Sequence, residues 1–241
     1  MDRKPIVVAV VDSGIDTGKS ELNNYVTKCT GFSVNPEGCI VEDQTADIKH
    51  PHGTAIAMII KHLCQNIEFI SVNILNERLT ADGRILLYAL EQVLKYQPDI
   101  IHLSLGVTKW KYKLPLGRIV KKAMKSNIHI VAAANNKGIR SYPAYLKGVI
   151  GVKGGSFKDK SEFYYKDKFF YAPPDTENIP GMEAYKCRCM RGTSMSAAYM
   201  TGHIANLLTA KTSLSHEALK ELLIAQALDL NEDDVKTNKI S

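Results

Sequence analysis

Three short segments of the sequence hold residue types that together could carry out acyl transfer. Asp12 directly follows an apolar run, His52 precedes a glycine, and Ser194 lies in the segment GTSMS at 192–196. A serine hydroxyl is a weak nucleophile and needs a neighbouring base, and an imidazole titrates near neutral pH. A carboxylate can orient that imidazole and stabilise its charged form. The segments therefore predict Ser194 as nucleophile, His52 as general base and Asp12 as the orienting carboxylate.

Each of these signals has an ordinary structural explanation when it is taken alone. An aspartate after a strand is usually a cap or turn residue, and a lone histidine before a glycine is more often structural than catalytic. Gly-Thr-Ser is a common way to begin a helix. The joint occurrence of all three in the order Asp, His, Ser favours catalysis over three separate structural roles. In addition, a helix beginning at Ser194 would offer its unpaired backbone N–H groups to an oxyanion.

The same segments resemble the motifs of a known family. "VVAVVDSGID", "HGTAIA" and "GTSMSAAYMTG" resemble the three catalytic motifs of the subtilisin-like (S8) serine peptidases, and the resemblance extends from about Ile6 to about Leu208. It implies that Asp12, His52 and Ser194 form the triad, in the order known for that family. It also implies an α/β three-layer sandwich with a mostly parallel central sheet.

Three more segments resemble the family's substrate-binding elements. "VAAANNKG" at 131–138 resembles the oxyanion-hole segment, which implies that Asn136 donates to the oxyanion. "HLSLG" at 102–106 resembles the strand that pairs with the substrate main chain, which implies that role for Ser104, Leu105 and Gly106. "SYPA" at 141–144 resembles the rim of the pocket for the residue before the scissile bond.

Two residues beside that rim are candidates for specificity. Arg140 and Ser141 precede Tyr142-Pro143, and we expect them to reach the pocket. An arginine there would favour an acidic substrate side chain, and Lys137 gives a weaker indication of the same kind. The alternative is that Arg140 is an ordinary exposed loop residue.

The chain departs from the family pattern behind the predicted triad. In its second motif Ala55 and Met58 replace histidine and glycine, and in its third, Pro-His and an alanine are replaced. Asn135 stands where glycine is common, and asparagine would suit that position if it required a positive φ. We expect these positions to support the triad by packing. The departures are Ala55, Met58, Asn135, Ala198, Tyr199 and Thr201.

Apolar runs and helical periodicities alternate along the chain, which predicts a parallel sheet with helices on both faces. With 241 residues, 45% of them apolar and 23% charged, we expect one domain, 1–241. Residues 154–168 and 173–191 are expected to be irregular. The predicted strands are Pro5 to Val11, Ile67 to Leu75, Ile100 to Leu105, Ile128 to Ala134, Val149 to Val152 and Phe169 to Ala172, and the predicted helices are Gly53 to Cys64, Ala81 to Tyr96, Gly117 to Ser126, Ser194 to Thr209 and Ser215 to Leu228.

Composition argues against several other kinds of protein. The net charge of +6 would suit nucleic-acid binding, but the basic runs at 109–113 and 118–125 accompany no RNA or DNA motif, so we expect no nucleic-acid partner. No apolar run reaches the length of a membrane span. The five cysteines and the missing export signal favour reduced thiols, with Cys187-Arg-Cys189 unsuited to structural zinc. Calcium-binding carboxylates of secreted family members do not map onto this chain, so we expect no metal and no cofactor.

The sequence therefore predicts a monomeric serine endopeptidase that acts on peptide or protein substrates through an acyl-enzyme. The expected location is the cytoplasm, or outside the cell if the sequence is a processed mature form. By its size and missing export signal the chain is similar to small subtilases that remove leader sequences from peptide natural products. The competing hypothesis is a pseudoprotease that binds peptides, because the residues behind the triad are replaced.

Overall fold

A nine-stranded sheet forms the centre of the computed structural model, which describes residues 3–18, 22–43, 48, 50–185, 187, 190–211 and 213–229. The strand order within these residues is β3-β2-β4-β1-β5-β6-β7-β9-β8. The seven inner strands, β2-β4-β1-β5-β6-β7-β9, are parallel to one another. The two edge strands, β3 and β8, pair antiparallel with their neighbours. The strands are β1 Ile6–Asp12, β2 Val26–Val34, β3 Ile40–Asp43, β4 Ile67–Asn73, β5 Ile100–Leu103, β6 His129–Ala133, β7 Val149–Gly154, β8 Tyr164–Lys166 and β9 Phe169–Ala172.

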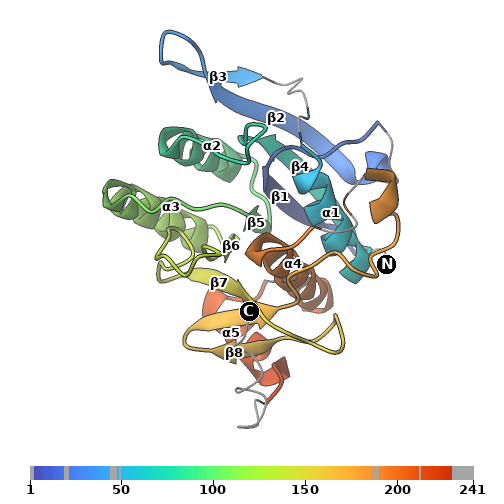
Figure 1. Ribbon diagram of the computed structural model, residues 1–241. Helices are drawn as coiled ribbons and strands as arrows, with labels where there is room; N and C mark the ends of the chain where they lie inside the picture. Colours follow the sequence, from blue (N-terminus) through green and yellow to red (C-terminus); the bar gives the residue numbers. More distant parts are fainter. Residues whose placement is uncertain are drawn as a thin grey trace.

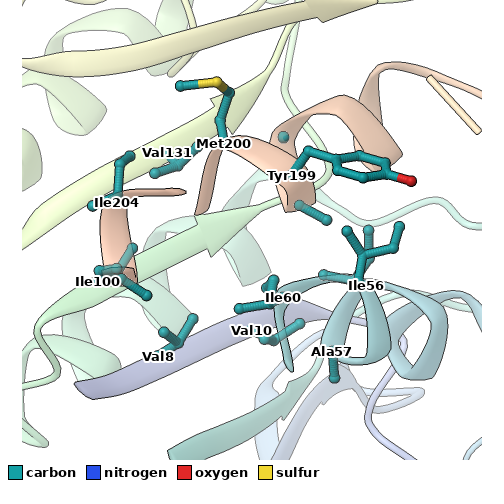
Figure 2. Packing of buried hydrophobic residues seen from close by; sticks show 14 of the residues in the cluster. Val8, Val10, Ile56, Ala57, Ile60, Ile100, Val131, Tyr199, Met200 and Ile204 are labelled. Carbon is teal, nitrogen blue, oxygen red and sulfur yellow. The ribbon is translucent and has the colours of Figure 1, made fainter. Parts of the chain in front are cut away.

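The central strands are apolar on both sides because helices cover both faces of the sheet. Successive side chains of a strand point to opposite faces, so Val8 and Val10 belong to one core and Ala9 and Val11 to the other. Figure 2 shows Val8 and Val10 of β1 among the side chains of the first of these two cores. The unbroken apolar run of β1 therefore serves two cores at once.

Five helices form the outer layers of the described chain (Figure 1). The first core packs α1 (His52–Leu63), α4 (Thr193–Ala210) and α5 (His216–Gln226) against the sheet. The second packs α2 (Gly83–Lys95) and α3 (Lys113–Lys125) on the opposite face. Single-turn helices lie at η1 (Asn23–Tyr25), η2 (Trp110–Tyr112) and η3 (Met182–Tyr185).

The helices begin in two different ways. Asp82 and Ser215 cap α2 and α5 in the usual manner, each accepting a bond from a first-turn backbone N–H. The residues before α1 and α4, Pro51 and Gly192, make no side-chain cap bond in the described structure. In the first turn of α4, the Thr193 N–H instead donates to Asn136 Oδ1 and the Met195 N–H to the Gly192 carbonyl.

The predicted fold class is confirmed, and the predicted strands and helices form close to the expected bounds. The predicted elements differ most from the structure near the two edges of the sheet and at the start of one helix. Strands β2 and β3 were not predicted, and β8 lies in the segment 154–168 that was expected to be irregular. Helix α3 begins at Lys113 instead of Gly117, because Pro115 falls in its first turn, where proline is tolerated although it usually marks a break in a helix. Edge strands are exposed on much of their surface and lack the apolar run of a central strand.

Several predictions about the surface and the thiols can be compared with the described chain. Cys29, Cys39 and Cys64 are free thiols. Cys189, and with it the Cys187-Arg-Cys189 pair, lies outside the described residues, as do the ends of the chain at 1–2 and 230–241. Within the described ranges, none of the helices is long and apolar enough to cross a membrane.

Candidate active site

Asp12, His52 and Ser194 come from three elements that meet at one edge of the sheet. Asp12 is the last residue of β1, His52 the first of α1, and Ser194 the second of α4. Ser104 follows β5, the strand beside β1. Carboxyl ends of parallel strands and the helix starts that follow them are the usual location of sites in such sheets.

Asp12 and His52 form a direct ion pair or hydrogen bond. His52 Nδ1 lies 2.8 Å from Asp12 Oδ1 and 3.0 Å from Oδ2. The Asp12 side chain is fully buried, and that of His52 is 12% exposed. A carboxylate on Nδ1 fixes the ring with Nε2 as its free nitrogen, which is the arrangement a general base requires.

Burial and mutual charge act against each other in this pair. Burial raises the pKa of Asp12, but the charge of His52 and hydrogen bonds from His52, Ser104 and the Ser13 backbone lower it to about 2. Burial lowers the pKa of His52, but the charge and hydrogen bond of Asp12 offset this and leave it raised above its ordinary value. Asp12 is therefore ionised at any physiological pH.

Ser104 joins the pair to Ser194. The Ser194 hydroxyl donates to the Ser104 carbonyl at 3.1 Å, and the Ser104 hydroxyl hydrogen-bonds the Asp12 carboxylate. One residue thus contacts both Asp12 and Ser194. Transfer of the serine proton to His52 requires the Ser194 hydroxyl to turn from this carbonyl, and such bonds commonly tighten only when substrate is present.

The end of β1 is tied to the start of α1 by Ser13 and Gly53. The Ser13 hydroxyl donates to the His50 carbonyl at 2.9 Å and accepts from the Gly53 backbone N–H at 3.0 Å. A Cβ at Gly53 would lie 2.3 Å from the carbonyl oxygen of Gly14 and 3.3 Å from Asp12 Oδ1. Glycine after His52 is therefore required for the backbone to approach this closely.

Asn136 lies in the loop after β6, beside the start of α4. Its Oδ1 accepts from the Thr193 backbone N–H at 2.9 Å, while the Thr193 hydroxyl donates to the Ala134 carbonyl at 2.6 Å. Gly192 has φ +149°, and a Cβ there would lie 3.3 Å from Asn136 Nδ2. Because Oδ1 is held by Thr193, the Nδ2 side of the amide is the side left to face a substrate.

The neighbouring Asn135 does not have the conformation that its position had suggested. It is not among the residues with positive φ. Its Oδ1 accepts from the Lys137 backbone N–H at 2.8 Å, and its carbonyl accepts from Gly138 at 3.1 Å. Glycine 138 takes the positive φ of this turn, so the condition we had placed on residue 135 is not met.

The residues predicted to bind substrate lie on two segments that are held together. Val107 and Tyr142 exchange backbone hydrogen bonds of 2.8 Å in both directions. This places Gly106 against Ser141, whose Cβ would be 3.3 Å from a Cβ on the glycine. Leu105 packs against the second core, and Ser141 is buried with its hydroxyl unpartnered in the described structure.

Arg140 is exposed, and its guanidinium lies against two aromatic rings. Its Cζ is 6.0 Å from the ring centre of Tyr142 and 5.6 Å from that of Tyr145. Stacking of this kind orients an arginine without neutralising its charge. The structure thus brings Gly106 and Ser141 together, with Arg140 stacked at the adjoining turn.

A hollow of about 540 Å³ opens near the site and was not predicted from the sequence. Phe32, Ile74 and Ile85 supply apolar walls, and Asn73 and Asp82 supply polar groups. Asn73 also forms a bridge with Ser13, next to Asp12. Residues far apart in the sequence line this hollow, so no local pattern could have revealed it. Among the described residues no cluster of His, Cys, Asp or Glu is placed to hold a metal ion.

Four of the six replaced positions lie in the first core or against it. Ala55, Ala198 and Tyr199 are buried there, and Met58 packs against its edge. Figure 2 shows Tyr199 of α4 above Ile56 of α1, at the contact between the two helices that carry Ser194 and His52.

The fold, this arrangement and the sequence agree in one class of protein. The sequence profile described as "Subtilase family" (Peptidase S8) matches residues 3–165. The chain therefore belongs to the subtilase family and is a subtilisin-like serine protease, a hydrolase. The matched range includes Asp12, His52 and Asn136, and the segment around Ser194 lies beyond it.

Individual relatives extend the likeness over most of the chain. It is 29% identical over 222 residues to the major intracellular serine protease of Bacillus subtilis (strain 168), covering 84% of this chain and 68% of that protein. It is 24% identical to subtilisin DY of Bacillus licheniformis, over 94% of this chain and 85% of that protein. A cold-adapted subtilisin-like serine proteinase of known structure shares the fold, with TM-score 0.71 and 17% identity over 93% of this chain and 84% of the other.

Proposed function

We propose that the chain is an endopeptidase that cuts peptide bonds with Ser194 as nucleophile, His52 as general base and Asp12 as its orienting carboxylate. Ser194 Oγ attacks the scissile carbonyl carbon while its proton passes to His52 Nε2. His52 then gives that proton to the leaving amine, which leaves an ester on Ser194. A water molecule, deprotonated by His52 in the same way, hydrolyses the ester and restores the serine.

The negative oxygen of each tetrahedral intermediate requires donors that are already oriented. The backbone N–H of Ser194 at the start of α4 and Nδ2 of Asn136 are the two groups we assign. The bond from Thr193 to Asn136 Oδ1, at 2.9 Å, supports this assignment because it fixes the direction of the amide.

One observation carries the proposal. The buried Asp12 contacts His52 at 2.8 Å, and Ser104 hydrogen-bonds both Asp12 and Ser194. An aspartate that only capped the end of a strand would not need to be fully buried against the ring of a partly exposed histidine.

The proposal can be tested with a fluorophosphonate probe, which reacts with activated serines. We expect the wild-type protein to be labelled and Ser194→Ala to remain unlabelled, and both Ser194→Ala and His52→Ala to lose several orders of magnitude in turnover with unchanged circular dichroism. Ser196→Ala, two residues further along α4, is the matched control and should still be labelled. Wild-type protein that is folded but unlabelled would instead support a peptide-binding pseudoprotease.

We infer that substrates bind as an extended strand along Ser104, Leu105 and Gly106, with Arg140 and Ser141 near the side chain before the scissile bond. The stacked guanidinium of Arg140 would favour acidic side chains there. Cleavage of a peptide library by the wild type should then show this preference and cleavage by Arg140→Ala should lose it. An unchanged profile would make Arg140 an ordinary surface residue.

We propose in addition that the physiological reaction is removal of a leader segment from a precursor peptide in the cytoplasm. The relative in Bacillus subtilis that is named intracellular supports the cytoplasmic location. A purified protein that releases one fragment from a precursor peptide, at one bond, would agree with the proposal. Unselective digestion of denatured proteins would argue for general turnover instead.

A further inference from the structure

Two polar side chains that the proposed chemistry does not use are fully buried beside the site. His102 of β5 and Thr201 of α4 are each 0% exposed. His102 Nδ1 lies 2.9 Å from Thr201 Oγ1. A buried polar pair is costly unless all its groups are bonded, so the second nitrogen of His102 is informative.

That second nitrogen leads to the site. His102 Nε2 lies 3.0 Å from the hydroxyl of Ser104, and this hydroxyl hydrogen-bonds Asp12. Thr201, His102 and Ser104 therefore form a chain of hydrogen bonds that ends on the Asp12 carboxylate. Asp12 also accepts from the Ser13 backbone N–H at 2.7 Å.

Counting protons fixes the direction of this chain. Burial lowers the pKa of His102 to about 4, so the ring is neutral and carries one N–H. If that N–H were on Nδ1, the Ser104 hydroxyl would have to donate its proton to Nε2. The ionised Asp12 would then lose its hydrogen bond from Ser104. If it is on Nε2, His102 donates to Ser104, Ser104 donates to Asp12, and Thr201 donates to Nδ1.

The second arrangement is favoured because a hydrogen bond to a buried carboxylate is about twice as strong as one between neutral groups. Its only loss is the bond from the Thr201 hydroxyl to the Ala197 carbonyl, at 2.8 Å. That carbonyl also receives the backbone N–H four residues further along the helix. The charge of Asp12 thus selects the tautomer of His102.

We propose that His102 is a positioning residue that acts through Ser104 on Asp12, supplying in its Nε2–H form the donor that holds the Ser104 hydroxyl on the carboxylate. The inference rests on the proposed function for its role in turnover. The hydrogen bonds themselves can be examined in protein that does not turn over substrate.

The first test is NMR spectroscopy of ¹⁵N-histidine-labelled Ser194→Ala protein, which cannot digest itself. We expect His102 to show one neutral tautomer, with the proton on Nε2, from pH 5 to pH 8. A signal from the Nδ1–H tautomer or from a charged ring in this range would overturn the proposal. This result does not depend on whether the wild type is a peptidase.

The second test follows the pKa of His52 in variants on the same background. Losing the donor to Asp12 leaves more negative charge facing His52, so Ser104→Ala and His102→Leu should each raise its pKa, by roughly half a unit or less. In the described part of the chain, the titratable groups that act on His52 are Asp12, His50 and His102 itself, and the His50 resonance is followed separately.

The double variant distinguishes a chain from general disturbance of the sheet. With Ser104 replaced by alanine, His102→Leu should cause no further shift, because both act through the same hydroxyl. Additive shifts, or no shift with His102→Leu, would overturn the proposal. If His102→Leu does not fold, His102→Gln serves instead, and its amide N–H should return the pKa of His52 toward the wild-type value relative to Ser104→Ala.

Kinetics in the active protein supply the third test. Thr201→Val removes the donor to His102 and should lower kcat severalfold with little change in KM. Thr209→Val is the matched control, because Thr209 makes the same bond to a carbonyl four residues back on α4, at 2.9 Å, away from the site. Equal effects in the two variants would show a helix effect and overturn the role of Thr201. Absence of any turnover in the wild type would contradict the proposed function and leave the NMR results standing.

Discussion

One hydrogen bond decides which way the Asn136 amide faces, and this makes its contribution measurable. We expect Asn136→Ala to lower kcat on the order of a hundredfold or more, because one donor to the oxyanion is lost. The matched control is Asn135→Ala, whose side chain binds only the turn at Lys137. Steady-state kinetics on one peptide substrate compare the two, and equal losses would show that Asn136 merely shapes the loop.

The Asp12–His52 pair predicts how activity depends on pH. His52 accepts a proton only when neutral, and its pKa is raised above the ordinary 6.5. The acid limb of kcat/KM should therefore lie above pH 6.5, with activity rising as pH passes through it. Asp12 titrates near pH 2, so it does not contribute to this limb.

The variant Asp12→Asn checks the cause of that shift. Without the negative charge, burial alone acts on the ring, and the acid limb of the residual activity should move to lower pH. A limb that stays in place would mean that some other group sets it.

At this scale the sequence predicted the triad from the order and context of three motifs, and Asn136 from a fourth. It did not single out His102 as a residue with a buried polar partner, although a histidine inside the apolar run of β5 is a signal that such a partner exists. The φ of Asn135 could not be read from its motif, because the turn places its strained residue at Gly138.

The contact between α1 and α4 sets the spacing of the elements that carry His52 and Ser194. A Cβ on Gly202 of α4 would lie 2.7 Å from Leu63 Cβ of α1. Gly202→Ala should therefore push the helices apart, with a net destabilisation of about 1–2 kcal/mol once the better helix propensity of alanine is included. We expect kcat to fall as well.

Gly117→Ala in α3 is the control for that substitution. Nothing lies within 4 Å of a Cβ at Gly117, so only the propensity gain of about 1 kcal/mol applies. Chemical denaturation of both variants should show opposite signs. A stabilised Gly202→Ala would mean that the two helices adjust freely.

Elements with a buried apolar face were predictable because their periodicity records what they pack against. The amphipathic pattern of α2 and the double-sided run of β1 are examples. In strand β2, the three exposed residues Thr27 to Cys29 are followed by a short buried stretch, so neither an alternating pattern nor a long apolar run marks the strand. Strand β8 has only three residues. Their pairing depends on neighbours that are distant in the sequence.

For the molecule as a whole, we expect stability to be independent of reducing agents. Cys29, Cys39 and Cys64 are free thiols, and burial raises the pKa of the Cys187 thiol to about 11, which disfavours its reactive thiolate form. Loss of a disulfide would cost about 2–5 kcal/mol and lower Tm by at least about 4 °C. Thermal unfolding with and without dithiothreitol should give the same Tm, and a fall of that size would reveal a disulfide.

The two edge strands of the sheet affect whether the protein aggregates at high concentration. Strand β3 has four residues and ends in exposed Glu42 and Asp43, and β8 has three and ends in Lys166. Short, charged edge strands disfavour the addition of a strand from another copy of the protein, which is the first step of fibre formation. An enzyme that captures extended peptides must still accept a strand somewhere. Under the proposed function that one permissive place is the segment from Ser104 to Gly106, so capture of substrate and resistance to aggregation are assigned to different parts of the same sheet.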